Sequence, residues 1–174
     1  MVFESLATSL QPWADYYAAS AVLPLVVLTA HVVSVFVGGG VAVATDRRLL
    51  RAEPGSSESF IAIAEDLQGT HRLVVSMLSI TILSGLAMAA ADVASYATLR
   101  LFWAKMGLIV LLLLNGALMR RTETQLLGAA RQTREEPIAG PTVTGPWRHL
   151  RSAAWRSLVC WLGIVILGVL VSNQ

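Results

Sequence analysis

The chain has 174 residues, of which 55% are apolar and 14% are charged, and its formal net charge is +2. Soluble domains carry nearer about 25% charged residues, so the composition indicates an integral membrane protein in a single domain, residues 1–174. The small positive charge is concentrated in two loops and gives no case for nucleic-acid binding. The one cysteine, Cys160, lies in an apolar run, which argues against a disulfide framework or a thiolate metal cluster.

Residues 3–19 combine leucines and aromatic side chains at helical spacing with a few charged groups. This pattern predicts a short interfacial helix on the outer leaflet, anchored by Trp13, Tyr16 and Tyr17. Residues 1–20 contain no Lys or Arg, so the positively charged start of a cleavable signal peptide is missing. The first membrane span is therefore expected to act as its own anchor.

Four apolar runs are long enough to cross the roughly 30 Å hydrocarbon core of a bilayer, which takes about 20 helical residues. These runs are 21–44, 73–91, 101–119 and 154–172. Lipid cannot satisfy exposed backbone amides, so each run is expected to be a helix. The sequence thus predicts an all-α fold, a four-helix transmembrane bundle that contacts the lipid bilayer directly.

Two longer connections are expected on the charged side of the membrane. Pro54 to Ser57 suggest a loop that ends in a helix N-cap, so the second helix is expected to begin near Glu58 and to enter lipid at about Leu73. The segment 133–146 is rich in Pro, Gly and Thr, which predicts a flexible connection.

The distribution of basic residues predicts the orientation. Eleven arginines lie in or beside the loops that join span one to span two and span three to span four, whereas only Arg100 and Lys105 lie toward the other side. Positively charged loops stay in the cytoplasm, so both termini are predicted to face outward across a bacterial cytoplasmic (inner) membrane. Three tryptophans near the cytoplasmic end of span four are expected at the interface: Trp147, Trp155 and Trp161.

His31 is the most informative single residue, because roughly 22 Å of helix separate it from Asp46 at the charged end of span one. Intramembrane ionisable groups are costly and usually face the bundle interior. Two interpretations stay open: a functional ligand, or a neutral histidine that hydrogen-bonds a neighbouring helix. Gly38 and Gly39 remove side-chain bulk below it, which suits either a closely packed helix or a flat ligand such as a porphyrin.

Lys105 and His71 are the other ionisable candidates. Lys105 lies about 9 Å inside span three and is either a snorkelling anchor beside Trp103 or a buried lysine that binds an anion, a propionate or a metal. His71, beside Arg72, is either solvated or in contact with lipid phosphate, or it serves a second cofactor or a proton path. His31 and His71 differ in depth by roughly 20 Å, against about 6 Å for His31 and Lys105, so a bis-His site is disfavoured.

Polar residues on the second and third spans have softer interpretations. A stripe of Met77, Thr81, Ser84 and Met88 on span two fits either ordinary helix contact or the wall of a cofactor or substrate channel, since Met ligates haem iron in some cytochromes. Asn115 in span three is expected to donate an interhelical hydrogen bond.

A set of short motifs between residues 22 and 121 resembles a known group of membrane proteins. The residues that carry the resemblance are His31, Gly38 to Gly40 and Asp46-Arg47-Arg48 in span one, Ser84-Gly85-Leu86 in span two, and Phe102-Trp103-Ala104-Lys105 at the start of span three. They look like the HemJ type of protoporphyrinogen oxidase and the copper-resistance CopD type, small proteins of four to five membrane helices. The resemblance implies a b-type haem between helices, with His31 and Lys105 as functional positions.

The chain also departs from the HemJ pattern. Asp46-Arg47 stands where that pattern has a Pro-Arg pair, the glycine spacing differs, and Asn115 or Arg120 replaces a histidine that often closes the third span. The fold and the haem site are therefore carried over more readily than the oxidase activity.

These residues together predict a haem-b redox protein that passes electrons to or from quinone or a porphyrinogen-like substrate. His31 is the expected iron ligand, and Lys105, Gly38, Gly39 and His71 are the other expected cofactor-binding positions. Whether the protein is itself an oxidoreductase enzyme stays open. The alternative is a non-catalytic accessory or assembly subunit, packed in a homo-oligomer or a larger membrane complex. A small transporter is a third interpretation, against which stands the lack of acidic residues inside the spans.

Overall fold

A computed structural model describes residues 2–52, 57–135 and 144–171 of the chain, and every regular element in these ranges is a helix. In chain order the helices are α1 (Val2–Ala19), α2 (Leu23–Arg51), α3 (Ser57–Ala91), α4 (Val93–Thr98), α5 (Arg100–Glu135) and α6 (Thr144–Val171). The prediction of an all-α fold is confirmed for the described part of the chain.

Four of the described helices contain stretches that are long and apolar enough to cross a membrane. These stretches are Leu23–Arg51 in α2, Gly69–Ala91 in α3, Arg100–Thr122 in α5 and Arg148–Val171 in α6. Each overlaps one of the four predicted spans and extends beyond it at the arginine-rich end. The helices themselves run further still, because helix formation does not stop where the apolar run gives way to arginines.

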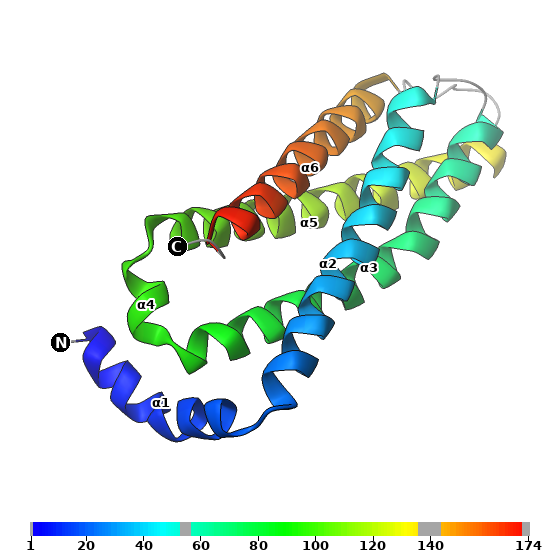
Figure 1. Ribbon diagram of the computed structural model, residues 1–174. Coiled ribbons are helices and arrows are strands. Elements are labelled where there is room, and N and C mark those ends of the chain that lie inside the picture. The colour runs from blue at the N-terminus through cyan, green and yellow to red at the C-terminus, as the bar shows by residue number, and fades with distance from the viewer. Residues whose placement is uncertain (1, 53–56, 136–143, 172–174) are drawn as a thin grey trace.

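The long helices form two antiparallel pairs, α2 with α3 and α5 with α6, and α6 also packs along α2 (Figure 1). The helices α1 and α4 lie together near the end of the bundle opposite the two long connections. The buried core takes residues from all four membrane-crossing helices: Ala42, Leu78, Ile109, Leu112, Cys160, Trp161 and Ile164.

Local sequence explains how the chain turns at the α1 and α4 end. Pro24 lies in the first turn of α2, where a missing backbone N–H costs nothing. The Ser20 hydroxyl accepts a hydrogen bond from the Leu23 amide at 3.1 Å, just ahead of that helix. Asp92 caps α4 by accepting a hydrogen bond from the Ser95 amide at 3.2 Å.

The N-terminal stretch is helical as predicted, and one of its aromatic residues ties it to the bundle. The Trp13 indole donates a hydrogen bond to the Ala87 carbonyl of α3 at 3.0 Å. Tyr17 packs against Trp13 with ring centroids 5.7 Å apart, whereas Tyr16 is 66% exposed. The helix therefore docks on α3 through Trp13, while Tyr16 stays exposed.

The boundaries of the two long connections differ from those predicted. Helix α3 begins at Ser57, close to the expected Glu58, while residues 53–56 lie outside the described part of the chain. Helix α5 continues to Glu135 and α6 begins at Thr144, so the prediction of a loop over 133–146 is wrong at both ends, and residues 136–143 are not described. Strong helix formers such as Gln, Leu, Ala and Arg after residue 124 explain the extension of α5.

Trp161 packs inside the bundle, unlike Trp155, with which the sequence groups it as an interfacial residue. Its side chain is 3% exposed and belongs to the core, whereas Trp155 is 61% exposed. Trp161 faces the core because it shares one face of α6 with the buried Ser157 and Ile164, at spacings of four and three residues. The side chain of Trp147 lies outside the described residues.

Candidate functional site

His31 faces α3 and forms the centre of a buried polar cluster. Its Nδ1 lies 3.0 Å from the Thr81 carbonyl oxygen and 3.0 Å from the Ser84 hydroxyl. Beside it, the hydroxyls of Ser34 and Thr81 are 2.8 Å apart. Ser34 is 2% exposed and Thr81 is 3% exposed, so no water competes for these bonds. Residues three apart share a helix face, which explains why Ser34 accompanies His31 and Ser84 accompanies Thr81.

The partners of His31 define which of its ring nitrogens is available. A carbonyl oxygen can only accept, so the Nδ1–H of His31 donates to Thr81. In the neutral imidazole the other nitrogen, Nε2, then keeps a free lone pair. Metal-ligating histidines usually donate their second ring N–H to a carbonyl or carboxylate, which fixes the tautomer and the ring orientation. The geometry suits both a ligand and an interhelical hydrogen-bond donor.

Lys105 lies close enough to His31 to act on it electrostatically. Both side chains are half-buried. The Lys105 Nζ is 3.6 Å from the position that a Cβ on Gly168 of α6 would occupy, and a Cβ on Gly85 would lie 3.2 Å from the His31 Cε1. The two glycines therefore let His31 and Lys105 pack directly against the backbones of α3 and α6. This arrangement agrees with the similar depth expected for the two residues.

The predicted glycine positions are covered by side chains of neighbouring helices. A Cβ on Gly38 would lie 2.7 Å from the Met77 Cβ of α3, and a Cβ on Gly39 would lie 3.2 Å from the Trp161 ring of α6. Of the two interpretations of these glycines, close helix packing accounts for both contacts. The stripe on span two likewise makes helix contact at Met77, Thr81 and Ser84. A cofactor contact at either glycine stays a prediction.

The side chains around His31 could bind a haem only if the macrocycle lay outside the contact between α2 and α3. The tight contact of Gly38 with Met77 leaves no room for a macrocycle between α2 and α3 at that level. Any iron would bind the Nε2 of His31, and Lys105, which is near enough to act on His31 electrostatically, would be the cation available for a propionate. No group of three or more His, Cys, Asp or Glu side chains gathers in the described part of the chain. A haem needs no such group, because its own nitrogens hold the iron.

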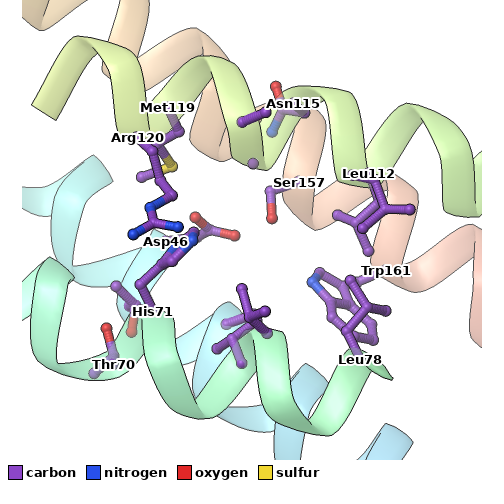
Figure 2. A pocket seen from close by; sticks show the side chains of 17 residues that line it. Asp46, Thr70, His71, Leu78, Leu112, Asn115, Met119, Arg120, Ser157 and Trp161 are labelled. Atoms are coloured by element: carbon purple, nitrogen blue, oxygen red, sulfur yellow. The ribbon is translucent and has the colours of Figure 1, made fainter. Parts of the chain in front are cut away.

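His71 does not join this cluster. It precedes Thr81 by ten residues on α3, or roughly 15 Å, and it is half-buried. Instead it lines a separate pocket of about 260 Å³ between the membrane-crossing helices (Figure 2). The two histidines that the sequence singled out therefore belong to different sites, which agrees with the argument against a bis-His haem.

The pocket that contains His71 is also lined by a buried carboxylate, that of Asp46. Asp46 is 4% exposed, and its Oδ2 has no hydrogen-bond partner among the described residues. The Ser157 hydroxyl of α6 is within hydrogen-bonding reach of the carboxylate. Figure 2 shows the carboxylate pointing into the pocket between Arg120 and Ser157. Arg120 is also close enough to His71 to act on it electrostatically.

The burial of Asp46 was not expected from the sequence, because the predicted first span ended at residue 44. Asp46 belongs to the same continuous helix, α2, so one acidic side chain is buried among the helices just beyond the predicted span. Asp46 lies four residues after Ala42 and three before Leu49, and both of these are buried. That helical spacing was visible in the sequence and identifies the same inward face.

Asn115 confirms its predicted role as an interhelical donor. Its Nδ2 donates to the Ala153 carbonyl of α6 at 2.9 Å, and its Oδ1 accepts from the Arg156 Nε at 3.0 Å. Asn115 also lines the pocket beside Asp46, so these bonds hold α5 and α6 together next to it.

No family model matches the chain, and no curated protein or solved structure does either. The resemblance to the HemJ and CopD types therefore stays a prediction, carried only by the residues quoted for it. The chain itself is identified, within its described residues, as an all-helical protein with four helices suited to crossing a membrane.

Proposed function

We propose that the protein is a membrane-embedded haem-b protein that passes electrons to or from quinone or a porphyrinogen-like substrate. One observation carries the proposal: the Nδ1 of His31 lies 3.0 Å from the Thr81 carbonyl oxygen. That bond leaves Nε2 as the coordinating nitrogen and holds the ring still, as in most metal-binding histidines. Intramembrane ionisable residues are retained mainly where they serve a function.

Each residue near the cofactor has a distinct task in this proposal. His31 holds the iron through Nε2, and Thr81 and Ser84 fix the orientation of its ring. Lys105 neutralises a haem propionate, because its half-buried ammonium lies near enough to His31 to act on it electrostatically. When bound, the haem would supply one-electron transfer within the bilayer, a reaction that few amino-acid side chains can carry out. Gly38 has no side chain, so Met77 of α3 packs directly against α2 at this level.

We also propose that both termini face outward across a bacterial inner membrane, with α1 on the outer leaflet. The support is the eleven arginines at the end of the long connections, against Arg100 and Lys105 toward the other end. Positive loops remain in the cytoplasm. The Trp13 and Tyr17 side chains of α1 suit the interface, where amphipathic rings are enriched.

The test is a visible spectrum of the purified protein. Cells supplied with a haem precursor would express the wild type, His31→Ala and His149→Ala, and each would be purified in detergent for reduced-minus-oxidised spectra and iron analysis. The wild type is expected to show a Soret band. The haem content of His31→Ala is expected to fall at least about tenfold, since removing even a residue that hydrogen-bonds a metal ligand lowers metal affinity by that factor. His149→Ala should keep its haem, because His149 is exposed.

A wild-type protein without haem, or a His31→Ala protein with an unchanged spectrum, would contradict the proposal. The second candidate, a non-catalytic subunit of a larger membrane complex, would then be favoured. Its supporting observation is that hydrogen bonds between Ser34, Thr81 and His31 already account for the buried polar groups as helix contacts. In that case the protein is expected to co-purify stoichiometrically with other membrane proteins.

A further inference from the structure

The pocket beside Asp46 lacks a partner for one buried oxygen. Asp46 is 4% exposed, and its Oδ2 accepts no hydrogen bond from any described residue. An unmet buried acceptor costs free energy unless a ligand or water fills the site. Because the carboxylate points into the pocket (Figure 2), a molecule bound there can supply the missing donor.

The opposite side of the pocket is apolar and partly aromatic. Leu78 of α3, Leu112 of α5 and Trp161 of α6 line it, and each is at most 7% exposed. A flat ring can pack against the indole with a favourable aromatic contact. The ligand therefore carries a polar group on one side and an apolar ring on the other.

The size of the pocket limits the ligand to one ring. Its volume is about 260 Å³. Cavities of about 150 Å³ accept benzene, while sites for larger ligands span roughly 300–1,000 Å³. A substituted single ring fits this space, whereas a tetrapyrrole such as a porphyrinogen does not.

Charge excludes the simple ions. Asp46 and Arg120 line the same pocket. The Arg120 guanidinium would repel a bare cation bound to Asp46, and the Asp46 carboxylate would repel an anion bound to Arg120. A neutral molecule with hydroxyl groups satisfies both, because a hydroxyl donates to a carboxylate and accepts from a guanidinium. His71 adds a second group that can exchange hydrogen bonds with such a ligand.

The ligand can arrive from the bilayer. Val75 of α3 and Leu113 of α5 both line the pocket, and each is 45% exposed. Both belong to membrane-crossing stretches. The pocket wall between α3 and α5 therefore includes side chains on the outer surface of the bundle, which lipid would cover in a membrane, and this suits a molecule dissolved in the bilayer.

We infer that the pocket beside Asp46 binds the headgroup of a hydroquinone, with a hydroxyl donating to the Asp46 Oδ2 and the ring against Trp161. Of the two substrate classes considered for the protein, this selects the quinone class over the porphyrinogen class. The binding site stands on the pocket alone. Only the role of the hydroquinone as an electron donor to haem rests on the proposed function.

The test uses radiolabelled duroquinol, a single-ring hydroquinone, with the full-length protein in detergent micelles and protein-free micelles as background. Gly116→Leu would fill the pocket, because Gly116 lines it and a Cβ there meets nothing within 4 Å. Gly107→Leu is the matched control on the same helix, since its Cβ is equally free and Gly107 does not line the pocket. Gly116→Leu is expected to weaken binding at least about tenfold, and Gly107→Leu to leave it unchanged.

Two further comparisons test the hydrogen bond to Asp46. Asp46→Asn is expected to weaken duroquinol binding about tenfold or more, while the exposed Asp15→Asn is expected to have no effect. The dimethyl ether of duroquinol, which has no hydroxyl donor, should bind wild type about as weakly as duroquinol binds Asp46→Asn. Equal affinities for Gly116→Leu and Gly107→Leu, or equal affinities of wild type for both ligands, would overturn the inference.

A spectrum recorded on the same samples separates this inference from the haem proposal. His31→Ala is expected to lose haem and keep duroquinol binding, because His31 lies outside the pocket. If the wild type holds no haem but binds duroquinol through Asp46, the site stands and the haem proposal fails. If it holds haem and duroquinol does not bind, the site fails and the haem proposal stands.

Discussion

Asn115 joins two helices at a depth where water cannot replace a lost partner. It is 7% exposed, donates to the Ala153 carbonyl and accepts from Arg156. Interhelical hydrogen bonds within membranes contribute about 0.6 kcal/mol on average and up to about 1.7 kcal/mol. Two bonds on one side chain put its contribution toward the upper end of that range.

Asn115→Ala is therefore expected to lower the free energy of unfolding by about 1–2 kcal/mol. The measurement is a denaturation curve in mixed detergent micelles, followed by circular dichroism. The control is Ser79→Ala, because the exposed Ser79 hydroxyl bonds only to the Val75 carbonyl of its own helix. A loss no larger than that of the control would mean that the bonds across α5 and α6 add no stability.

At the residue scale the sequence identified candidates but not their partners. His31 was recognisable from its depth alone, because a lone imidazole in an apolar run is rare. Its acceptor, the Thr81 carbonyl, carries no side-chain signal and depends on how α2 and α3 cross. The burial of Asp46 was not predicted for a different reason. An apolar run ends at the first charged residue, even where the helix and its buried face continue beyond that residue.

At the scale of single helices, the glycines of α2 decide how closely its neighbours approach. Gly38 meets Met77 of α3 and Gly39 meets the Trp161 ring of α6, whereas a Cβ on Gly40 would meet nothing within 4 Å. Three successive glycines therefore have three different environments. Small residues at membrane helix interfaces let backbones approach closely, and only the first two serve that purpose here.

Gly38→Ala is expected to destabilise the protein by about 1–3 kcal/mol, because the new methyl group overlaps the Met77 Cβ and α3 must move away. Gly40→Ala is the matched control and is expected to be neutral or to stabilise by up to about 1 kcal/mol through helix propensity. Both are measured by the same denaturation curves. Equal effects of the two substitutions would show that α2 and α3 do not pack at Gly38 as described.

The helix ends show the limit of sequence patterns at this scale. Helices α5 and α6 run past the predicted spans to Glu135 and from Thr144. The pattern of apolar residues reports where a helix can lie in lipid, while helix propensity decides where it ends in water. The burial of Trp161 has a separate cause, because Trp161 lies on the same inward face of α6 as Ser157 and Ile164.

At the scale of the whole molecule, the charge asymmetry predicts the orientation. Single-cysteine labelling can test it, because the native Cys160 is buried and stays silent toward a membrane-impermeant maleimide. Ser95→Cys in α4 and Thr124→Cys beyond the α5 span both offer exposed positions at opposite ends of the bundle. Ser95→Cys is expected to react in intact cells and Thr124→Cys only after permeabilisation. The reverse order would place the arginine-rich end outside.

Sequence alone determined the class of this protein: helices throughout its described residues, four of them long and apolar enough to cross a membrane, and one strongly basic end. Hydropathy, helix length and charge are sums over neighbouring residues, so they can be evaluated without knowing which helices touch. Tertiary structure alone decided that His31 bonds to Thr81 and that Asp46 shares a pocket with His71 and Arg120. Such contacts depend on how each helix is rotated about its own axis. Successive side chains point about 100° apart around that axis, and only packing against the other helices decides which of them face inward.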